Sequence, residues 1–168
     1  IEACLVGSEM CIRDRAFLSQ GGRVVIGLSE ALSPTLGGAW EKVICQLGKW
    51  AACSVEEAAV EDFTLLSFID TTRKPLDVFR SSSFRDFTSV FFWKHRDLRV
   101  QESEKQIPEA RIMASFDDEM PFLIKRDLNP GTVFIMTAGW TPEQSQLGQN
   151  SRFATLMIQL AGLRDLRP

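Results

Sequence analysis

Three short apolar runs constrain the fold of this 168-residue chain more than any other feature. They are Val24–Leu28, Leu65–Ile69 and Thr132–Ala138, and each is too short for a typical buried helix. A nearly continuous apolar run of this length is typical of a strand that is covered on both faces. We therefore expect the three runs to lie in one sheet with helices on each side.

Helical spacing predicts two helices that could cover this sheet. Residues 39–50 carry apolar side chains at helical intervals, and a final helix capped by Asn150 or Ser151 should run to about Leu163. The buried stripe of the first helix would consist of Trp40, Val43, Ile44 and Leu47.

Turn residues predict the connections in the second half of the chain. Two short strands, Arg111–Phe116 and Pro121–Lys125, flank an acidic turn over residues 117–119 and so predict a β-hairpin. A second turn signal, residues 129–131, precedes the last apolar run. Residues 88–100 begin as a strand and then become highly charged, and we expect the aromatic residues at their start, Phe91, Phe92 and Trp93, to belong to the core.

The N-terminal segment has a different origin in our interpretation. Residues 4–15, CLVGSEMCIRDR, resemble the translation of a transposase-type sequencing adapter, which leaves residues 16–168 as one partial domain. We expect residues 1–15 to make few contacts, and Leu5, Val6 and Ile12 not to be packed together into the core. The alternative is an ordinary amphipathic N-terminal segment.

Composition excludes several classes of function. The 19 basic and 22 acidic residues give a formal net charge of −3, which provides no basic field for nucleic acid. No apolar run approaches the roughly 20 residues that span a bilayer. With a single histidine, a zinc site would need carboxylates to complete it, so we predict no metal and no cofactor.

The cysteines do not indicate a disulfide framework or a catalytic centre. Cys4 and Cys11 lie in the adapter-like segment, and we expect Cys45 and Cys53 to be buried packing residues, with a bridge or a nucleophile as the alternative. His95 lies in the charged sequence WKHRD, and we expect it at the surface. A pair formed by Cys53 and His95 stays open as an alternative, because nucleophilic catalysis requires a positioned pair.

Other polar residues have structural and functional interpretations. Ser145 lacks a G-x-S-x-G context, so a loop or capping serine is the main interpretation and a nucleophile the alternative. The acidic run Asp117–Glu119 is interpreted as a solvated turn, with oxygen ligation of a divalent cation as the alternative.

The segment after the last apolar run is the best candidate for a recognition surface. Open α/β sheets bind their ligands at the carboxyl ends of the strands. This position makes Gly139, Trp140, Thr141 and Ser145 the candidate ligand or partner residues. The structural alternative is that the Trp140 indole packs over the edge of the sheet.

Residues 110–160 also resemble a known family. They are similar to the C-terminal part of the class I glutamine amidotransferase-like domain of bacterial BatA-type (aerotolerance regulator-like) membrane proteins. That family has a strand of the form A-R-x-x-A-x-F-D-D-x-x-P, then a hairpin, a glycine turn, an apolar strand, a GW-x-P-x-x-SQL loop and a helix with an aromatic residue. The matching positions are Ala110, Arg111, Ala114, Phe116, Asp117, Asp118, Pro121, Gly131, Gly139, Trp140, Pro142, Ser145, Gln146, Leu147 and Phe153.

The resemblance covers most of residues 16–165 and carries expectations about fold and parent protein. It implies a flavodoxin-like three-layer α/β sandwich with a mostly parallel sheet, incomplete at its N-terminus, plus the hairpin near residue 118. It also implies a membrane-anchored parent in which membrane helices, and often a von Willebrand A-type domain, precede this region.

Two functions follow from these observations. The first is a non-catalytic interaction or ligand-sensing module whose partners are other domains of its parent or other proteins. The second is a fragment of a cysteine-dependent amidase or glutamine amidotransferase whose nucleophile elbow, of the form G-x-C-x-G, is lost. The resemblance implies such an elbow in active amidotransferases, and neither Cys45 nor Cys53 has the flanking glycines.

Overall fold

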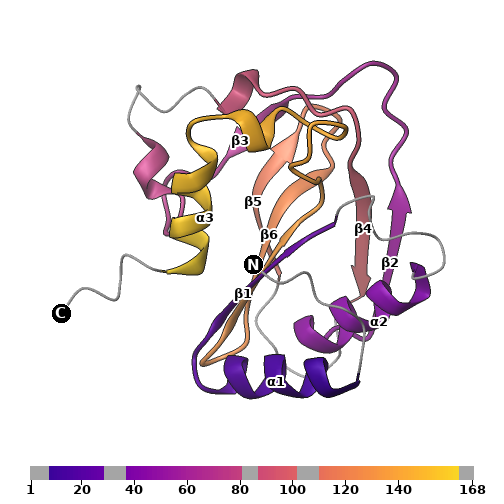
Figure 1. Ribbon diagram of the computed structural model, residues 1–168, viewed down its shortest axis with the longest axis vertical. Coiled ribbons are helices and arrows are strands. Elements are labelled where there is room, and N and C mark those ends of the chain that lie inside the picture. Colours follow the sequence, from indigo (N-terminus) through magenta and orange to yellow (C-terminus); the bar gives the residue numbers. More distant parts are fainter. Residues whose placement is uncertain (1–7, 29–36, 81–86, 102–109, 163–168) are drawn as a thin grey trace.

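The computed structural model describes residues 8–28, 37–80, 87–101 and 110–162. These residues form a mixed α/β fold with a five-stranded sheet, a two-stranded sheet and helices packed around them (Figure 1). The helices are α1 (Ser8–Ser19), α2 (Gly37–Gly48), α3 (Phe153–Ala161) and the 3-10 turns η1 (Asp77–Arg80) and η3 (Leu147–Gln149). The strands are β1 (Arg23–Gly27), β2 (Ala52–Glu57), β3 (Leu66–Ile69), β4 (Arg96–Gln101), β5 (Arg111–Phe116), β6 (Pro121–Asp127) and β7 (Thr132–Met136).

The five-stranded sheet has the order β1-β7-β6-β5-β3. It contains the strands from all three apolar runs, as expected. The expectation of a mostly parallel, flavodoxin-like sandwich is wrong, however, because only β1 and β7 are parallel and the other pairs are antiparallel.

Short turns explain this strand direction. β5 and β6 are joined by residues 117–120, and β6 and β7 by residues 128–131. A parallel pair needs a crossover of roughly a dozen residues or more, so these short connections force antiparallel neighbours. The β1–β7 pair is formed by strands far apart in sequence and is free to be parallel. The hairpin expected near residue 118 is present.

Both faces of β7 are buried, which accounts for its apolar run, whereas the edge strand β3 leaves Phe68 50% exposed, so its run is covered on one face only. In β7, Phe134 and Met136 pack into the core beneath α3, while Val133 and Ile135 pack into a second core beneath α1 and α2. Figure 1 shows α3 on one side of the sheet, with α2 and the β2–β4 ribbon on the other. Burial on both faces fixes the apolar character of a strand and leaves its direction open.

The two predicted helices are present as α2 and α3. Val43, Ile44 and Leu47 of α2 are buried as predicted, and the side chain of Trp40 lies outside the described residues. Arg126, fully buried in β6, donates from Nε to the Gly48 carbonyl at 3.0 Å at the end of α2. A cation at a helix C-terminus interacts favourably with the helix dipole.

The last helix buries Leu156 and Leu160 and ends at Gly162, whose φ of 72° is the left-handed conformation that terminates helices. The expected cap at Asn150 or Ser151 is wrong, because Arg152 occupies the N-cap position without a side-chain cap hydrogen bond. Asn150 Oδ1 accepts the Arg152 amide at 2.9 Å just before the helix begins. Within the described ranges, no helix combines the length and the apolar character that a membrane span requires.

The adapter-like segment supplies Ser8–Arg15, the first two thirds of α1. The side chains of residues 13–15 are exposed or half-buried, whereas Leu18 near the end of the helix is buried. Leu5, Val6 and the side chain of Ile12, whose joint burial would contradict the expectation of few contacts, lie outside the described part of the chain.

Candidate functional site

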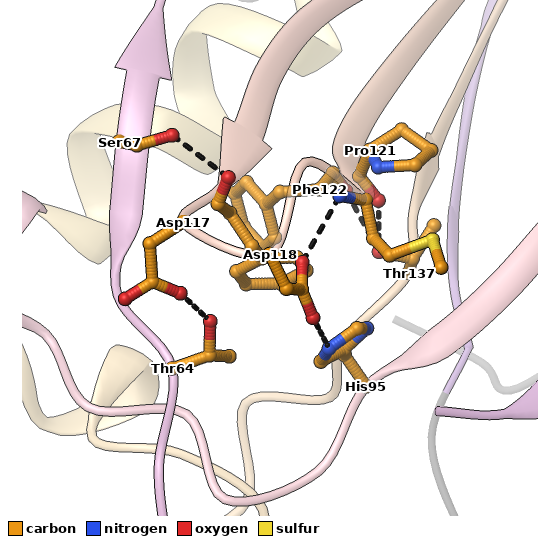
Figure 2. Close-up of polar contacts among 10 residues, drawn as sticks. Thr64, Ser67, His95, Asp117, Asp118, Pro121, Phe122 and Thr137 are labelled. Atoms are coloured by element: carbon orange, nitrogen blue, oxygen red, sulfur yellow. Dashed lines mark hydrogen bonds and ion pairs between the residues drawn. The ribbon is translucent and has the colours of Figure 1, made fainter. Parts of the chain in front are cut away.

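Several segments meet where the parallel strands β1 and β7 end. Thr137 follows β7, the acidic turn joins β5 to β6, and His95 immediately precedes β4. The backbone holds these segments together, because the Arg96 amide donates to the Thr137 carbonyl at 2.7 Å and the Thr137 amide donates to the Phe122 carbonyl at 2.9 Å. Figure 2 shows the polar groups gathered at this point.

A fully buried histidine, paired with a partly exposed carboxylate, lies at the centre of this region. His95 Nε2 is 2.8 Å from Asp118 Oδ2, and the imidazole lies 4.4 Å from the Phe116 ring, centroid to centroid. The side chain of His95 is fully buried, while that of Asp118 is 37% exposed. The expectation of a surface histidine is therefore wrong.

The backbone around His95 explains why the imidazole points inward. Its carbonyl accepts the Ala58 amide at 3.1 Å, and the next residue bonds to Thr137, so this segment is fixed between the two sheets. The charged residues that follow His95 in WKHRD form ion pairs of their own. Arg96 is half-buried beside Glu57, and Asp97 is buried beside Arg99.

The acidic turn is exposed, as expected, but two of its carboxylates have structural roles. Asp118 Oδ1 accepts the Met120 amide at 3.0 Å, and Asp117 accepts the Thr64 hydroxyl. Glu119 adopts a positive φ of 68°, which short turns of this kind require at one position. Among the described residues, no group of three or more His, Cys, Asp or Glu side chains is arranged for a metal ion.

The pair is poorly placed for catalysis. A histidine held by a carboxylate acts as a general base when a nucleophile lies within hydrogen-bond reach. The nearby hydroxyls donate elsewhere: Thr137 to the Pro121 carbonyl at 2.6 Å and Ser67 to the Phe116 carbonyl at 2.7 Å. Complete burial of the imidazole also prevents a substrate from reaching it, so the pair is best interpreted as structural.

The two central cysteines form a disulfide, which corrects the expectation of packing thiols. Cys45 of α2 and Cys53 of β2 are bonded, with their Cα atoms 5.7 Å apart. The turn at Lys49, with a φ of 53°, folds β2 back beside α2 and brings them together. Cys53 pairs with Val100, at the opposite end of the β2–β4 ribbon from His95, so the structure does not form the alternative Cys53–His95 pair.

The four predicted recognition residues lie in one loop, which is held together by hydrogen bonds between its own residues. Ser145 is fully buried; its hydroxyl donates to the Gly139 carbonyl at 2.7 Å and accepts the Leu147 amide at 3.2 Å, as a loop serine would. The Thr141 carbonyl accepts the amides of Gln144 and Ser145. Gly139 is buried, which leaves Trp140 and Thr141, both half-buried, as the members that reach the surface.

Trp140 packs over the end of the sheet, the structural alternative considered for it. A Cβ atom on Gly27 would lie 2.3 Å from the indole ring, so the glycine is what allows this close approach. The indole also lies 5.7 Å from the Phe153 ring at the start of α3. The residue thereby ties the loop after β7 to β1 and to the last helix.

Sequence reasoning missed an exposed aromatic surface beside this loop. Phe63, Phe91 and Trp93 are 49%, 36% and 38% exposed, whereas Phe92 is fully buried. The expectation that all three residues of the Phe91–Trp93 run are core holds only for Phe92. Alternation along an extended segment sends neighbouring side chains to opposite faces, and that period of two was the signal available in the sequence.

Comparison of the chain with known protein families, with curated proteins and with solved structures finds no match in any of the three.

Proposed function

We propose that this domain is a non-catalytic interaction module of a larger, membrane-anchored bacterial protein. In this proposal it binds another protein domain through the aromatic surface formed by Phe63, Phe91 and Trp93. The observation that carries the proposal is the exposure of three large aromatic side chains on two adjacent backbone segments.

The aromatic surface is rigid before any partner binds. Phe92 exchanges two backbone hydrogen bonds with Thr64, at 2.9 and 3.0 Å, and this fixes the two segments side by side. The Trp93 amide donates to the Gln144 carbonyl at 2.8 Å, and the Phe91 carbonyl accepts the Gln146 amide at 3.0 Å. The loop that contains Trp140 and Thr141 therefore supports the surface from one side.

Exposed aromatic residues suit a protein partner. The Phe63 and Phe91 rings lie 4.6 Å apart, so they present one continuous apolar patch with Trp93 near it. Aromatic side chains are enriched at the energetic centres of interfaces, and a fixed surface loses less conformational entropy on binding. The burial of His95 and the Cys45–Cys53 bond argue against the amidase alternative.

The membrane-anchored parent is inferred from the sequence resemblance over residues 110–160. Within these residues, β5, β6, β7, the Trp140 loop and α3 follow one another in the order that the resemblance implies. The strand directions in the sheet are not those of the expected fold. The membrane-anchored parent is therefore proposed from the sequence motif alone.

The test is a binding measurement with the other domains encoded by the complete reading frame. We expect calorimetry to detect binding to the wild-type domain, and expect Phe63→Ala and Trp93→Ala each to weaken it by about tenfold or more. Phe17→Ala is the matched control, because Phe17 is 53% exposed beside Gly22, at the other end of β1. Equal binding by all variants would contradict the proposed surface.

A second measurement separates the module from an enzyme. The domain is incubated with glutamine and a thiol-reactive probe, with and without reductant, alongside Cys53→Ala and His95→Ala variants. We expect no hydrolysis, and no labelling of Cys53 that depends on His95. Glutamine hydrolysis abolished by both substitutions would overturn the assignment as non-catalytic.

A further inference from the structure

Acidic side chains flank the aromatic surface on the side of Phe63. Glu61 and Asp62 directly precede Phe63 in a bend of the chain, and both are exposed. The residue after Phe63, Thr64, donates its hydroxyl to Asp117, so the acidic turn between β5 and β6 lies beside the same segment (Figure 2). Three carboxylates thus lie near this end of the aromatic surface.

A fourth carboxylate lies on the side of Trp93. The Trp93 amide donates to the Gln144 carbonyl at 2.8 Å, and Glu143, immediately before Gln144, is exposed. The aromatic surface is therefore bordered by acidic residues both at Phe63 and at Trp93. These four residues, which we call the acidic rim, are Glu61, Asp62, Asp117 and Glu143.

The acidic rim is not neutralised within the protein. Among the described residues, none of its carboxylates forms an ion pair. The two segments that carry the aromatic residues, 58–65 and 87–95, contain a single lysine or arginine, Lys94, which is half-buried and has interactions of its own. The surface around the exposed aromatic side chains consequently has an excess of negative charge.

Aromatic rings bordered by carboxylates suit a cation with a flat face. The faces of tryptophan and phenylalanine rings attract cations, arginine more often than lysine, and a guanidinium can also bond to both oxygens of one carboxylate. An acidic partner would instead meet like charge, which costs free energy when the two surfaces come together. Charge complementarity therefore favours a basic partner over a neutral or an acidic one.

We propose that the aromatic surface binds a basic, arginine-containing segment of its partner protein. Arginine side chains of that segment stack on the exposed rings of Phe63, Phe91 and Trp93, and their guanidinium groups pair with the acidic rim. Apolar side chains between the arginines cover the rest of the patch. The inference rests on the proposed function and adds to it the chemistry of the partner.

The experiment measures the binding of a synthetic probe to the full chain by fluorescence anisotropy. The probe is a labelled peptide in which arginine and leucine alternate, and a second peptide carries citrulline, the uncharged analogue, in place of each arginine. We expect saturable binding of the arginine peptide, and expect the citrulline peptide to bind more weakly by about tenfold or more, because citrulline forms neither ion pairs nor cation–π contacts. Higher ionic strength should weaken the binding of the arginine peptide, since exposed ion pairs are screened by salt.

Matched variants assign the effect to this surface. The double substitution Glu61→Gln and Asp62→Asn should weaken binding of the arginine peptide by about fivefold and leave the citrulline peptide unaffected, whereas Trp93→Ala should weaken both. Asp77→Asn is the control and should bind as the wild type does. Asp77 is exposed on η1, which is hydrogen-bonded to the residues that follow β3, at the opposite end of that strand from Phe63.

The outcomes separate this inference from the proposed function. Circular dichroism checks that the variants are folded, and Glu61 and Asp62 lie in an exposed bend, so their substitution should not affect folding. Equal binding of the two peptides, no saturable binding of either, or an equal loss in Asp77→Asn would overturn the basic partner. If Phe63→Ala still weakens binding of the parent's other domains in that case, the aromatic surface stands and only its partner chemistry is wrong. If Phe63→Ala has no effect there either, the proposed function fails as well.

Discussion

At the level of single residues, the His95–Asp118 pair fixes the β5–β6 turn against the segment that leads into β4. Removing the carboxylate leaves a fully buried imidazole without its hydrogen-bond partner. Among the described residues His95 Nδ1 already has no partner, so no second hydrogen bond compensates. Loss of one partner from a buried polar group costs roughly the desolvation of the group that remains.

We therefore expect Asp118→Ala to lower the free energy of unfolding by about 1–3 kcal/mol, measured by urea denaturation. Glu119→Ala is the control, because it removes the same charge from the same exposed turn without touching His95. Loss of stability in Asp118→Ala no greater than in Glu119→Ala would show that the buried pair contributes little.

The Asp127 carboxylate predicts a specific acid dependence of stability. Burial acts to raise its pKa, but hydrogen bonds from Lys125 and Thr132 outweigh burial and hold the pKa below its ordinary value of 3.8. A lowered pKa in the folded state means that the carboxylate stabilises the protein above its ordinary pKa, and that this contribution is lost as the pH falls through the lowered one.

Asp127→Asn should thus be less stable than the wild type at neutral pH, and the difference should shrink as the pH falls below about 4. Urea denaturation of both proteins between neutral pH and about pH 2 measures it. A difference that stays constant over the whole range would mean that the pKa of Asp127 is the same in the folded and unfolded states.

At the level of elements, the disulfide connects α2 to β2 across a short loop. In the loop-closure treatment, a bridge with a sequence separation of 8 stabilises the native state by about 2.5 kcal/mol. We expect Cys53→Ser to lose about this much stability in urea, and reductant to destabilise the wild type but not the variant. Non-reducing peptide mapping should recover the fragments that contain Cys45 and Cys53 linked together; recovery of the two as separate free thiols would contradict the bridge.

Local patterns predicted individual elements better than their arrangement. The stripe of Val43, Ile44 and Leu47 identified α2, and the acidic turn identified the hairpin, because helical periodicity and turn chemistry are local in sequence. The predicted direction of the strands was wrong. Both short turns had been recognised, but the apolar runs suggested a parallel sheet. The burial of His95 and its contact with Asp118 depend on segments brought together by the sheet, which no local pattern contains.

At the level of the whole molecule, the position of each strand in the sheets predicts its resistance to opening. β6 and β7 each have a neighbour on both sides, whereas β3 lies at the edge of the five-stranded sheet and β2 belongs to a two-stranded ribbon. We expect amide hydrogen exchange to be slowest in β6 and β7 and faster in β2 and β3. An edge strand can separate from the sheet by local unfolding, whereas a central strand is exposed only when more of the sheet unfolds. Protection of β3 as high as that of β7 would contradict the strand order.

The parallel β1–β7 pair also has a consequence for synthesis on the ribosome. Arg23 pairs with Thr132, so β1 emerges roughly a hundred residues before the strand that completes its hydrogen bonding. At typical elongation rates of about 5–20 residues per second, β1 stays without this partner for several seconds. Once β7 is synthesised, it can pair at once with β6, to which a short turn connects it. The nascent chain therefore passes through an interval in which an unpaired apolar strand is available to chaperones or to neighbouring chains.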